Sequence, residues 1–149
     1  MAAMYKALAL VVAVTMASGV AMAGQTPSPG RPPSVRDGLF TMAQAGRGRA
    51  AYMKACAECH AADLSGHEYA GALAGFGFQL KWQDASVAEL YGRIRSMPLG
   101  RPGSLTTAEY VDILAYVLER NTYPAGAQEL TPAFAGQRWP RVMLERVVR

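Results

Sequence analysis

Three segments of this chain begin with the sequence signature of a helix N-terminus, a Ser or Thr followed three residues later by Glu or Gln. In this signature the hydroxyl accepts a hydrogen bond from the third following amide, while the longer side chain reaches back to the first residue. The segments start at Thr41-x-x-Gln44, Ser86-x-x-Glu89 and Thr106-x-x-Glu109. Beyond residue 38 the sequence contains no alternating run of β-branched residues of the kind that forms strands. The pattern therefore predicts a domain built only of α-helices.

The last predicted helix has the clearest apolar face. Its apolar residues recur three and four positions apart, which places them on one side of a helix: Tyr110, Ile113, Leu114, Val117 and Leu118. We expect this helix to run from Thr107 to about Arg120. Asn121 is suited to the left-handed conformation of a helix C-cap, and Pro124 prevents continuation.

The first predicted helix carries small residues on one side, with Gly48 among them. A glycine in the middle of a helix costs about 1 kcal/mol relative to alanine, so it is best explained by another backbone or an aromatic ring that approaches closely. The last predicted helix offers Tyr116 for such a contact. The sequence therefore predicts that the first and last helices cross at Gly48. The middle helix should stop before Pro98.

The first 23 residues have the pattern of a secretory signal peptide. A short n-region with Lys6 precedes apolar residues from Ala7 to Ala17, and Ala21-Met22-Ala23 fits the A-x-A site of signal peptidase. We place cleavage after Ala23. An uncleaved membrane anchor is the alternative, although residues 7–23 are short of the roughly 20 residues that cross a bilayer. The pattern predicts export from the cytoplasm, with no membrane span left after cleavage.

The mature chain divides by composition into three parts. Residues 24–38 are rich in Pro and Gly, which favour extended structure, and form a predicted tether. Residues 39–130 form the predicted domain, and residues 131–149 a basic tail with four arginines and one glutamate. Because the domain carries 8 basic and 9 acidic side chains, it lacks the array of Lys and Arg that binds nucleic acid. We therefore expect no nucleic-acid partner.

Both cysteines lie in Cys56-Ala57-Glu58-Cys59-His60, and C-x-x-C-H is the attachment sequence of c-type haem. In this chemistry the two thiols add across the vinyl groups of the porphyrin as thioethers, and the next residue places an imidazole nitrogen on the iron. We therefore expect covalent haem on Cys56 and Cys59, with His60 as the proximal iron ligand.

Three other uses of the two cysteines are open. A disulfide would suit an oxidising compartment, but a loop this short constrains the unfolded chain little. A thioredoxin-like redox pair needs strands, which the sequence does not show. A zinc site would need His67 as a fourth ligand beside Cys56, Cys59 and His60, without the usual separation into two pairs.

An iron held by His60 has a second axial position, for which the sequence offers five candidates. They are Met42, Met53, Met97, Met143 and His67. Met42 and Met53 precede the cysteines in the helix that presents the proximal face, and Met143 lies in the predicted tail. Met97 lies in a stretch rich in Pro and Gly, 37 residues after His60, which allows the chain to pass around the haem edge. A methionine in a helical protein is also ordinary core material.

Several short motifs outside C-x-x-C-H occur together between about Phe40 and Gly126. These are Arg47-Gly48-x-x-x-Tyr52, Ala62-Asp63-Leu64-Ser65-Gly66, Met97-Pro98 with Arg101-Pro102-Gly103-Ser104-Leu105, and Tyr110-x-Asp112-Ile113-Leu114-Ala115-Tyr116 ending in Asn121-x-Tyr123-Pro124-Ala125-Gly126. In combination they resemble those of small class I c-type cytochromes. The resemblance is greatest to the periplasmic cytochromes associated with quinoprotein (PQQ-dependent) dehydrogenases.

The resemblance implies an all-α class I cytochrome c fold, with helices wrapped around one covalently bound haem c. It implies thioethers at Cys56 and Cys59, with His60 and Met97 as the proximal and distal iron ligands. It also implies a carbonyl at Ala72, where family members usually carry proline, that orients the proximal imidazole.

A protein of this kind is expected to be a periplasmic electron carrier or an electron-transfer subunit. We do not expect it to be an enzyme on its own, because nothing in the sequence resembles a general base, a nucleophile or a substrate pocket. The expected partners are redox proteins: a quinoprotein dehydrogenase as donor, and an oxidase or another cytochrome as acceptor. The alternative is a haem protein that binds small ligands or is catalytic, in which Met97 is displaced and His67 or the loop Gly71–Gly77 forms the distal side. Trp82 resembles an aromatic that packs near the haem propionates in the family, and fits a plain core position equally well.

Overall fold

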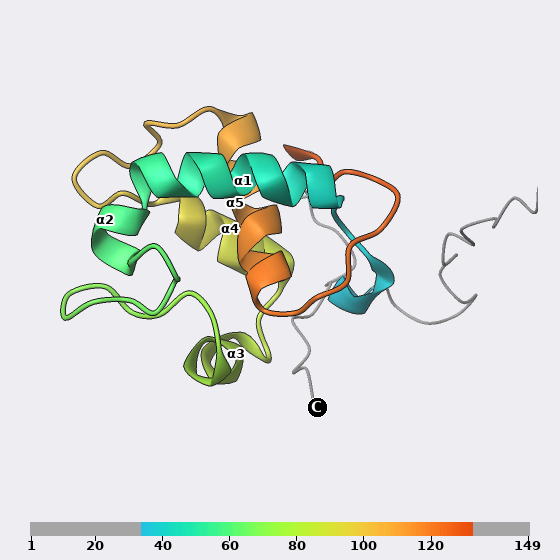
Figure 1. Cartoon of the computed structure of the whole chain (residues 1–149), viewed down its shortest axis with the longest axis horizontal. Helices are drawn as coiled ribbons and strands as arrows, with labels where there is room; N and C mark the ends of the chain where they lie inside the picture. Colours follow the sequence, from blue (N-terminus) through green and yellow to red (C-terminus); the bar gives the residue numbers. More distant parts are fainter. Residues whose placement is uncertain (1–33, 133–149) are drawn as a thin grey trace, which may run out of the picture.

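The computed structural model of the protein describes residues 34–132, in which helices are joined by loops (Figure 1). A 3-10 turn and five α-helices follow one another: η1 (Val35–Asp37), α1 (Met42–Ala55), α2 (Ala57–His60), α3 (Phe76–Trp82), α4 (Val87–Arg95) and α5 (Thr107–Arg120). Within residues 34–132 no strand is assigned, and His67 and Ala70 pair only as an isolated bridge. The predicted all-α fold is confirmed, and α5 has the predicted bounds.

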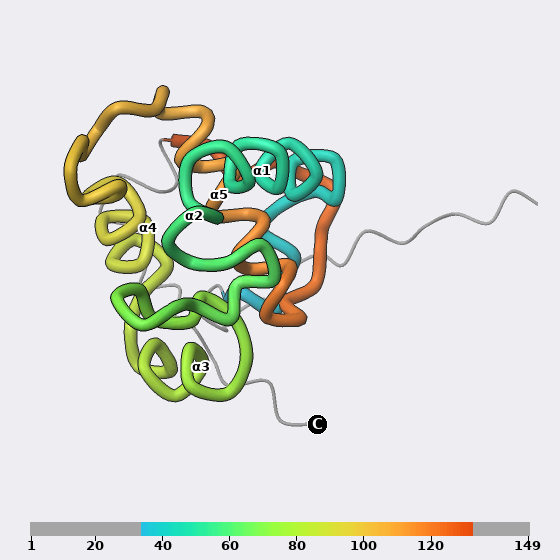
Figure 2. The backbone as a smooth tube through the Cα atoms, turned by 60° about the vertical axis from the view of Figure 1, so that its left-hand side comes forward, coloured from blue at the N-terminus to red at the C-terminus, as the bar shows by residue number. Residues whose placement is uncertain are grey.

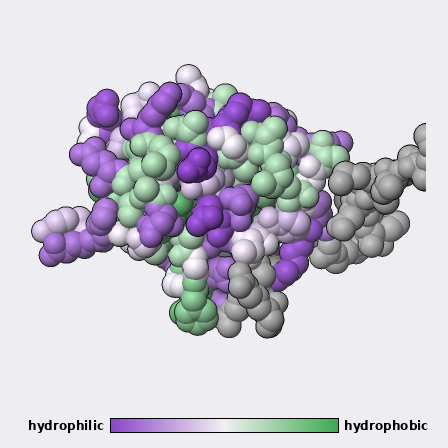
Figure 3. Space-filling view, in the orientation of Figure 1, coloured by the Kyte–Doolittle hydropathy of each residue, from purple (hydrophilic) through white to green (hydrophobic). Residues whose placement is uncertain are grey.

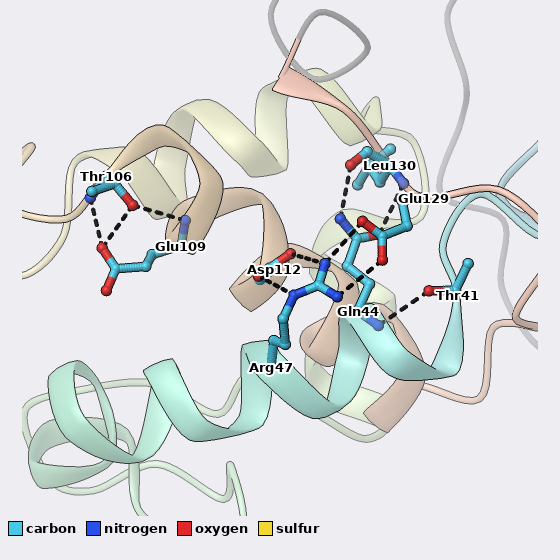
Figure 4. Close-up of polar contacts among 8 residues, drawn as sticks. All are labelled: Thr41, Gln44, Arg47, Thr106, Glu109, Asp112, Glu129 and Leu130. Atoms are coloured by element: carbon cyan, nitrogen blue, oxygen red, sulfur yellow. Dashed lines mark hydrogen bonds and ion pairs between the residues drawn. The ribbon is translucent and has the colours of Figure 1, made fainter.

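Two of the three predicted capping boxes are complete. The Ser86 hydroxyl accepts from the Glu89 amide at 3.2 Å, and the Glu89 carboxylate accepts from the Ser86 amide at 2.6 Å. Thr106 and Glu109 repeat this arrangement at the start of α5 (Figure 4). These bonds satisfy backbone amides that the first turn of a helix leaves unpaired.

At the start of α1 only half of the predicted capping box forms. The Thr41 hydroxyl accepts a hydrogen bond from the Gln44 amide at 3.1 Å, but the Gln44 side chain does not reach back. Instead this buried side chain forms two 2.8 Å hydrogen bonds with the backbone of Leu130, one donated and one accepted (Figure 4). Because a buried amide must satisfy both of its polar ends, the contact ties the segment after α5 to the start of α1.

Helices α1 and α5 cross in close contact at the predicted residue (Figures 1 and 2). A Cβ atom added to Gly48 would overlap the carbonyl group of Asp112 and lie 3.0 Å from the Cβ atom of Tyr116. One turn further along α1, the ring of Tyr52 lies 5.4 Å from that of Tyr116, tilted by 57°. Glycine is required at position 48 because the backbones of the two helices meet there.

The exposed side chain of Arg47 links α1 to α5 and to the segment after α5 at the edge of this crossing. The Arg47 guanidinium binds the carboxylates of Asp112 on α5 at 3.0 Å and of Glu129 in the following segment at 2.9 Å (Figure 4). The hydrogen bond with Arg47 holds the pKa of Glu129 below its ordinary value. Exposed ion pairs contribute little to stability individually, so the crossing depends on its buried contacts.

The end of α5 differs from the prediction at Asn121. Asn121 has a φ of −95°, and the next residue, Thr122, adopts the left-handed conformation with a φ of 66°. The buried side chain of Asn121 donates to the carbonyl oxygens of Leu73 and Val117 at 2.9 and 2.8 Å. It also accepts from the Gly75 amide at 3.1 Å. Asn121 therefore binds the loop before α3 instead of serving as a left-handed cap.

The described part of the chain begins inside the predicted tether. Ser34 and Val35 are buried, and Val35 belongs to the hydrophobic core. The folded unit therefore includes residues 34–38. The predicted signal peptide, residues 24–33 of the tether and all but the first two residues of the predicted tail lie outside the described residues. Among residues 34–132, no helix has the length and apolar character needed to cross a membrane.

Replacement of Gly48 by alanine tests the crossing. The added methyl group would overlap the Asp112 carbonyl, so the helices must separate, and we expect the free energy of unfolding to fall by about 1 to 3 kcal/mol. Gly46 is the matched control on the same helix, because nothing lies within 4 Å of its added Cβ atom. Gly46→Ala should raise the free energy of unfolding by up to about 1 kcal/mol through helix propensity. Chemical denaturation measures both values, and equal shifts would contradict the crossing.

Candidate functional site

The C-x-x-C-H motif occupies a single helical turn directly after α1. Cys56 follows the last residue of α1, and α2 spans Ala57–His60. The Cys56 carbonyl oxygen accepts hydrogen bonds from the amides of Cys59 and His60 at 3.2 and 2.9 Å. One turn of helix therefore brings together three of the predicted site residues, Cys56, Cys59 and His60.

The backbone orients the imidazole of His60. Its Nδ1 atom lies 2.8 Å from the carbonyl oxygen of Gly71. A carbonyl oxygen only accepts hydrogen bonds, so Nδ1 is the donor, and in the neutral ring the lone pair is on Nε2. A neutral imidazole held in this way binds a metal through Nε2. The carbonyl expected at Ala72 is provided by Gly71, so that prediction is wrong by one residue.

A buried tyrosine holds the chain where it leaves the motif. Ala61 has a φ of 62°, which is unfavourable for a residue with a Cβ atom. The Tyr52 hydroxyl donates to the Ala61 carbonyl oxygen at 2.7 Å, and the Gly66 amide donates to the His60 carbonyl oxygen at 3.0 Å. These bonds stabilise the turn after His60. Tyr52 belongs to the motif Arg47-Gly48-x-x-x-Tyr52, but no sequence pattern signals the contact of its hydroxyl.

The surroundings of the two thiols do not favour their alternative uses. Both cysteines are free, and burial raises the pKa of Cys56 to about 11, whereas a redox-active dithiol needs a thiol with a lowered pKa. Within residues 34–132, no three His, Cys, Asp or Glu side chains are grouped so that they could hold a metal ion, so the zinc site with His67 does not form. That part of the chain also lacks the strands that a thioredoxin-like pair requires.

Met97 lies near the beginning of the connection between α4 and α5. Its amide donates to the Ile94 carbonyl oxygen in the last turn of α4 at 3.0 Å. Its carbonyl oxygen accepts a 2.8 Å hydrogen bond from the hydroxyl of Tyr110, a buried residue of α5. The Met97 side chain is partly buried. Met97 therefore has a defined backbone position, on a segment of the chain separate from His60.

The other candidates for a second iron ligand are placed differently. Met42 and Met53 lie on α1 and are 61% and 44% exposed. His67 is exposed and lies in the loop between α2 and α3, the loop whose Gly71 carbonyl bonds to His60. Met143 lies outside the described residues.

Large apolar side chains are exposed on the segments that follow His60 and Met97. Phe76 and Leu80, one turn apart on α3, are 69% and 49% exposed, and Leu99 is 73% exposed. Figure 3 shows apolar atoms, in green, at the lower edge of the molecule where α3 lies. A contiguous patch of exposed apolar side chains marks a surface that binds an apolar ligand or partner, whereas single exposed ones are ordinary. Two thiols on one helical turn and an imidazole bonded through Nδ1 to a backbone carbonyl fit a covalently bound haem.

Helix α3 begins at Phe76, inside the glycine-rich stretch Gly71–Gly77 that was predicted to be a loop. It also carries Trp82, for which two roles were open. The Trp82 ring packs against the core, with its centroid 6.2 Å from that of Phe78. The structure shows this packing contact, and the role of Trp82 near the haem propionates stays a prediction.

Comparison with known protein families agrees with this geometry. A family model described as Cytochrome C oxidase, cbb3-type, subunit III matches residues 43–117, which extend from α1 into α5 and include both the cysteine motif and Met97. The searches among curated proteins and among solved structures found no match. The family match covers half of the chain. The chain therefore belongs to this family of cytochrome c domains, and it is a class I c-type cytochrome whose cofactor is covalently bound haem c.

Proposed function

We propose that this protein carries single electrons in the periplasm, with one haem c bound to Cys56 and Cys59 and with His60 and Met97 as the axial ligands of the iron. Haem-based electron transfer is the general activity of its family. The observation that carries the proposal is the hydrogen bond between His60 Nδ1 and the Gly71 carbonyl oxygen, because it leaves Nε2 for the iron.

The cysteines attach the cofactor without an external oxidant or reductant. Each sulfur forms a bond to one vinyl carbon, and the thiol hydrogen passes to the neighbouring carbon. Because Cys56, Cys59 and His60 share one helical turn, the same turn provides both covalent bonds and the proximal ligand. When bound, the haem supplies one-electron chemistry, in which its iron alternates between the ferric and ferrous states.

The two proposed ligands adjust the reduction potential in opposite directions. The Met97 thioether is a soft ligand that favours ferrous iron, so a His/Met pair gives a higher potential than two histidines. The Gly71 carbonyl increases the basicity of the His60 imidazole, which favours ferric iron. Attachment of both segments to packed helices keeps the ligands in place while the oxidation state changes.

The proposed partners are redox proteins in the periplasm. The signal-like residues 1–23 support export, and cytochrome c domains of this kind are typically extracytoplasmic. The motif resemblance supports a quinoprotein dehydrogenase as electron donor. The acceptor is an oxidase or another cytochrome, which agrees with the oxidase named in the family description.

Replacement of Met97 by alanine tests the distal ligand. Loss of the thioether opens a coordination position and removes the preference for ferrous iron. Met97→Ala should therefore lose the sulfur-to-iron charge-transfer band of the ferric protein, show a lower reduction potential, and bind carbon monoxide when reduced. Absorption spectroscopy and potentiometry of the haem-loaded protein measure these properties.

Three variants serve as controls for this experiment. Met42→Ala, Met53→Ala and His67→Ala should leave all three properties nearly unchanged, because Met42 and Met53 lie on α1 before the motif and His67 lies in the loop whose Gly71 carbonyl bonds to His60. If the unaltered protein already binds carbon monoxide readily, or if His67→Ala is the variant that opens the iron, the assignment of Met97 is contradicted. Those results would support the alternative of a haem protein with a displaceable ligand.

Replacement of both cysteines by serine tests the covalent attachment. A serine hydroxyl does not form the thioether, so the double variant Cys56→Ser, Cys59→Ser should lose the haem stain after denaturing electrophoresis, whereas the unaltered protein keeps it. Glu58→Ala provides the control, since this exposed side chain lies within the motif but has no thiol that could form a thioether. Retained stain in the double variant would contradict the attachment.

A further inference from the structure

One hydroxyl group joins the two ends of the connection between α4 and α5. Tyr110 lies in the first turn of α5, and its side chain is buried. Its hydroxyl donates to the Met97 carbonyl oxygen at 2.8 Å and accepts from the Leu105 amide at 3.5 Å. The phenol oxygen of Tyr110 thus bonds to the backbone at both ends of the stretch from residue 97 to residue 105.

The other backbone hydrogen bonds of this loop join it to itself or to the end of α4. The Arg101 amide donates to the Pro98 carbonyl oxygen at 2.8 Å, and the Gly103 amide donates to the Arg95 carbonyl oxygen at 3.2 Å. Turns of this kind shape the loop, but they do not relate it to α5. The bond from Tyr110 does so, because Tyr110 is part of that helix.

Helix α5 is in turn fixed relative to the cysteine motif. Its backbone meets α1 at Gly48, and α1 ends directly before Cys56. The capping box at Thr106 orders the first turn of α5, the turn that carries Tyr110. The motif with His60 and the loop with Met97 are therefore connected through two packed helices and the Tyr110 hydroxyl.

We infer that Tyr110 is a positioning residue for Met97, whose backbone it holds in one place relative to α5 so that the thioether remains on the iron. This inference rests on the proposed function, in which Met97 is the distal ligand. The helix period explains the ring of Tyr110 as part of the apolar face of α5. It does not explain a hydroxyl directed at Met97, since phenylalanine would fill the same position in the core.

The variant Tyr110→Phe removes this hydroxyl and keeps the ring. Loss of a hydrogen bond changes a local equilibrium by roughly tenfold. In the haem-loaded protein we therefore expect carbon monoxide to bind the reduced form about tenfold faster, and the charge-transfer band of the ferric form to weaken. Tyr116→Phe is the matched control, because it removes another buried phenol from the same helix, beside Tyr52 instead of Met97. It should change neither property.

A double variant separates this inference from the proposed function. Added to Met97→Ala, Tyr110→Phe should cause no further increase in carbon monoxide binding, because the hydroxyl acts through the bound thioether. If Met97→Ala leaves the charge-transfer band intact, the proposed function and the inference are both overturned. If Met97→Ala removes the band but Tyr110→Phe behaves like Tyr116→Phe, only the role of Tyr110 is overturned. A further tenfold increase in the rate of carbon monoxide binding in the double variant would show that Tyr110→Phe loosens the fold in general. That result would also overturn the role of Tyr110.

Discussion

The close approach of α1 and α5 at Gly48 is the contact on which the rest of the structure depends. The backbone of α1 lies directly against the Asp112 carbonyl of α5, which only a residue without a Cβ atom permits. The ring contact between Tyr52 and Tyr116 extends this contact by one turn. At the start of α1, Gln44 forms two hydrogen bonds with the backbone of Leu130, in the segment after α5. Because α1 leads directly into the cysteine motif, the crossing positions the cofactor attachment relative to α5.

Helix α5 holds both sides of the proposed haem site, one at each end. Its first turn reaches the Met97 backbone through Tyr110. The residue that follows its last turn, Asn121, binds the backbone of Leu73 and Gly75, close to Gly71 in the loop that orients His60. Both proposed ligands are therefore positioned by contacts of one helix. Such a frame suits electron transfer, because ligands that stay in place demand little rearrangement when the charge of the iron changes.

The parts of this structure that depend on local sequence could be predicted from it. The bounds of α5 followed from its apolar period, its capping box and the breaker at Pro124, and the crossing followed from a glycine that a helix would otherwise not favour. The chemistry of the cysteine motif is likewise contained in five consecutive residues.

The parts that depend on distant partners could not be predicted. The Gln44 side chain finds its partner 86 residues away, and Asn121 bonds to the loop before α3 across 46 and 48 residues, so their local capping signals were misleading. The path of the backbone decides whether the carbonyl of Gly71 or of Ala72 points at His60. This loop consists of small residues, and their sequence has no periodicity from which that path could be predicted. The hydroxyl contacts of Tyr52 and Tyr110 were missed for a related reason, since a helix period reports only the side on which a ring lies.

The proton NMR spectrum of the reduced, haem-loaded protein tests most directly the central claim that Met97 binds the iron opposite His60. A methyl group held over the porphyrin lies in its ring current, so the methyl resonance of the bound methionine should be shifted far upfield of all others. Methionine labelled with ¹³C at the methyl group identifies that resonance as a methionine, and replacement of one methionine at a time assigns it. If Met97 binds the iron, the shifted resonance disappears in Met97→Ala and persists in Met42→Ala and Met53→Ala. Its absence from the unaltered protein, or its loss with a methionine other than Met97, would contradict the account.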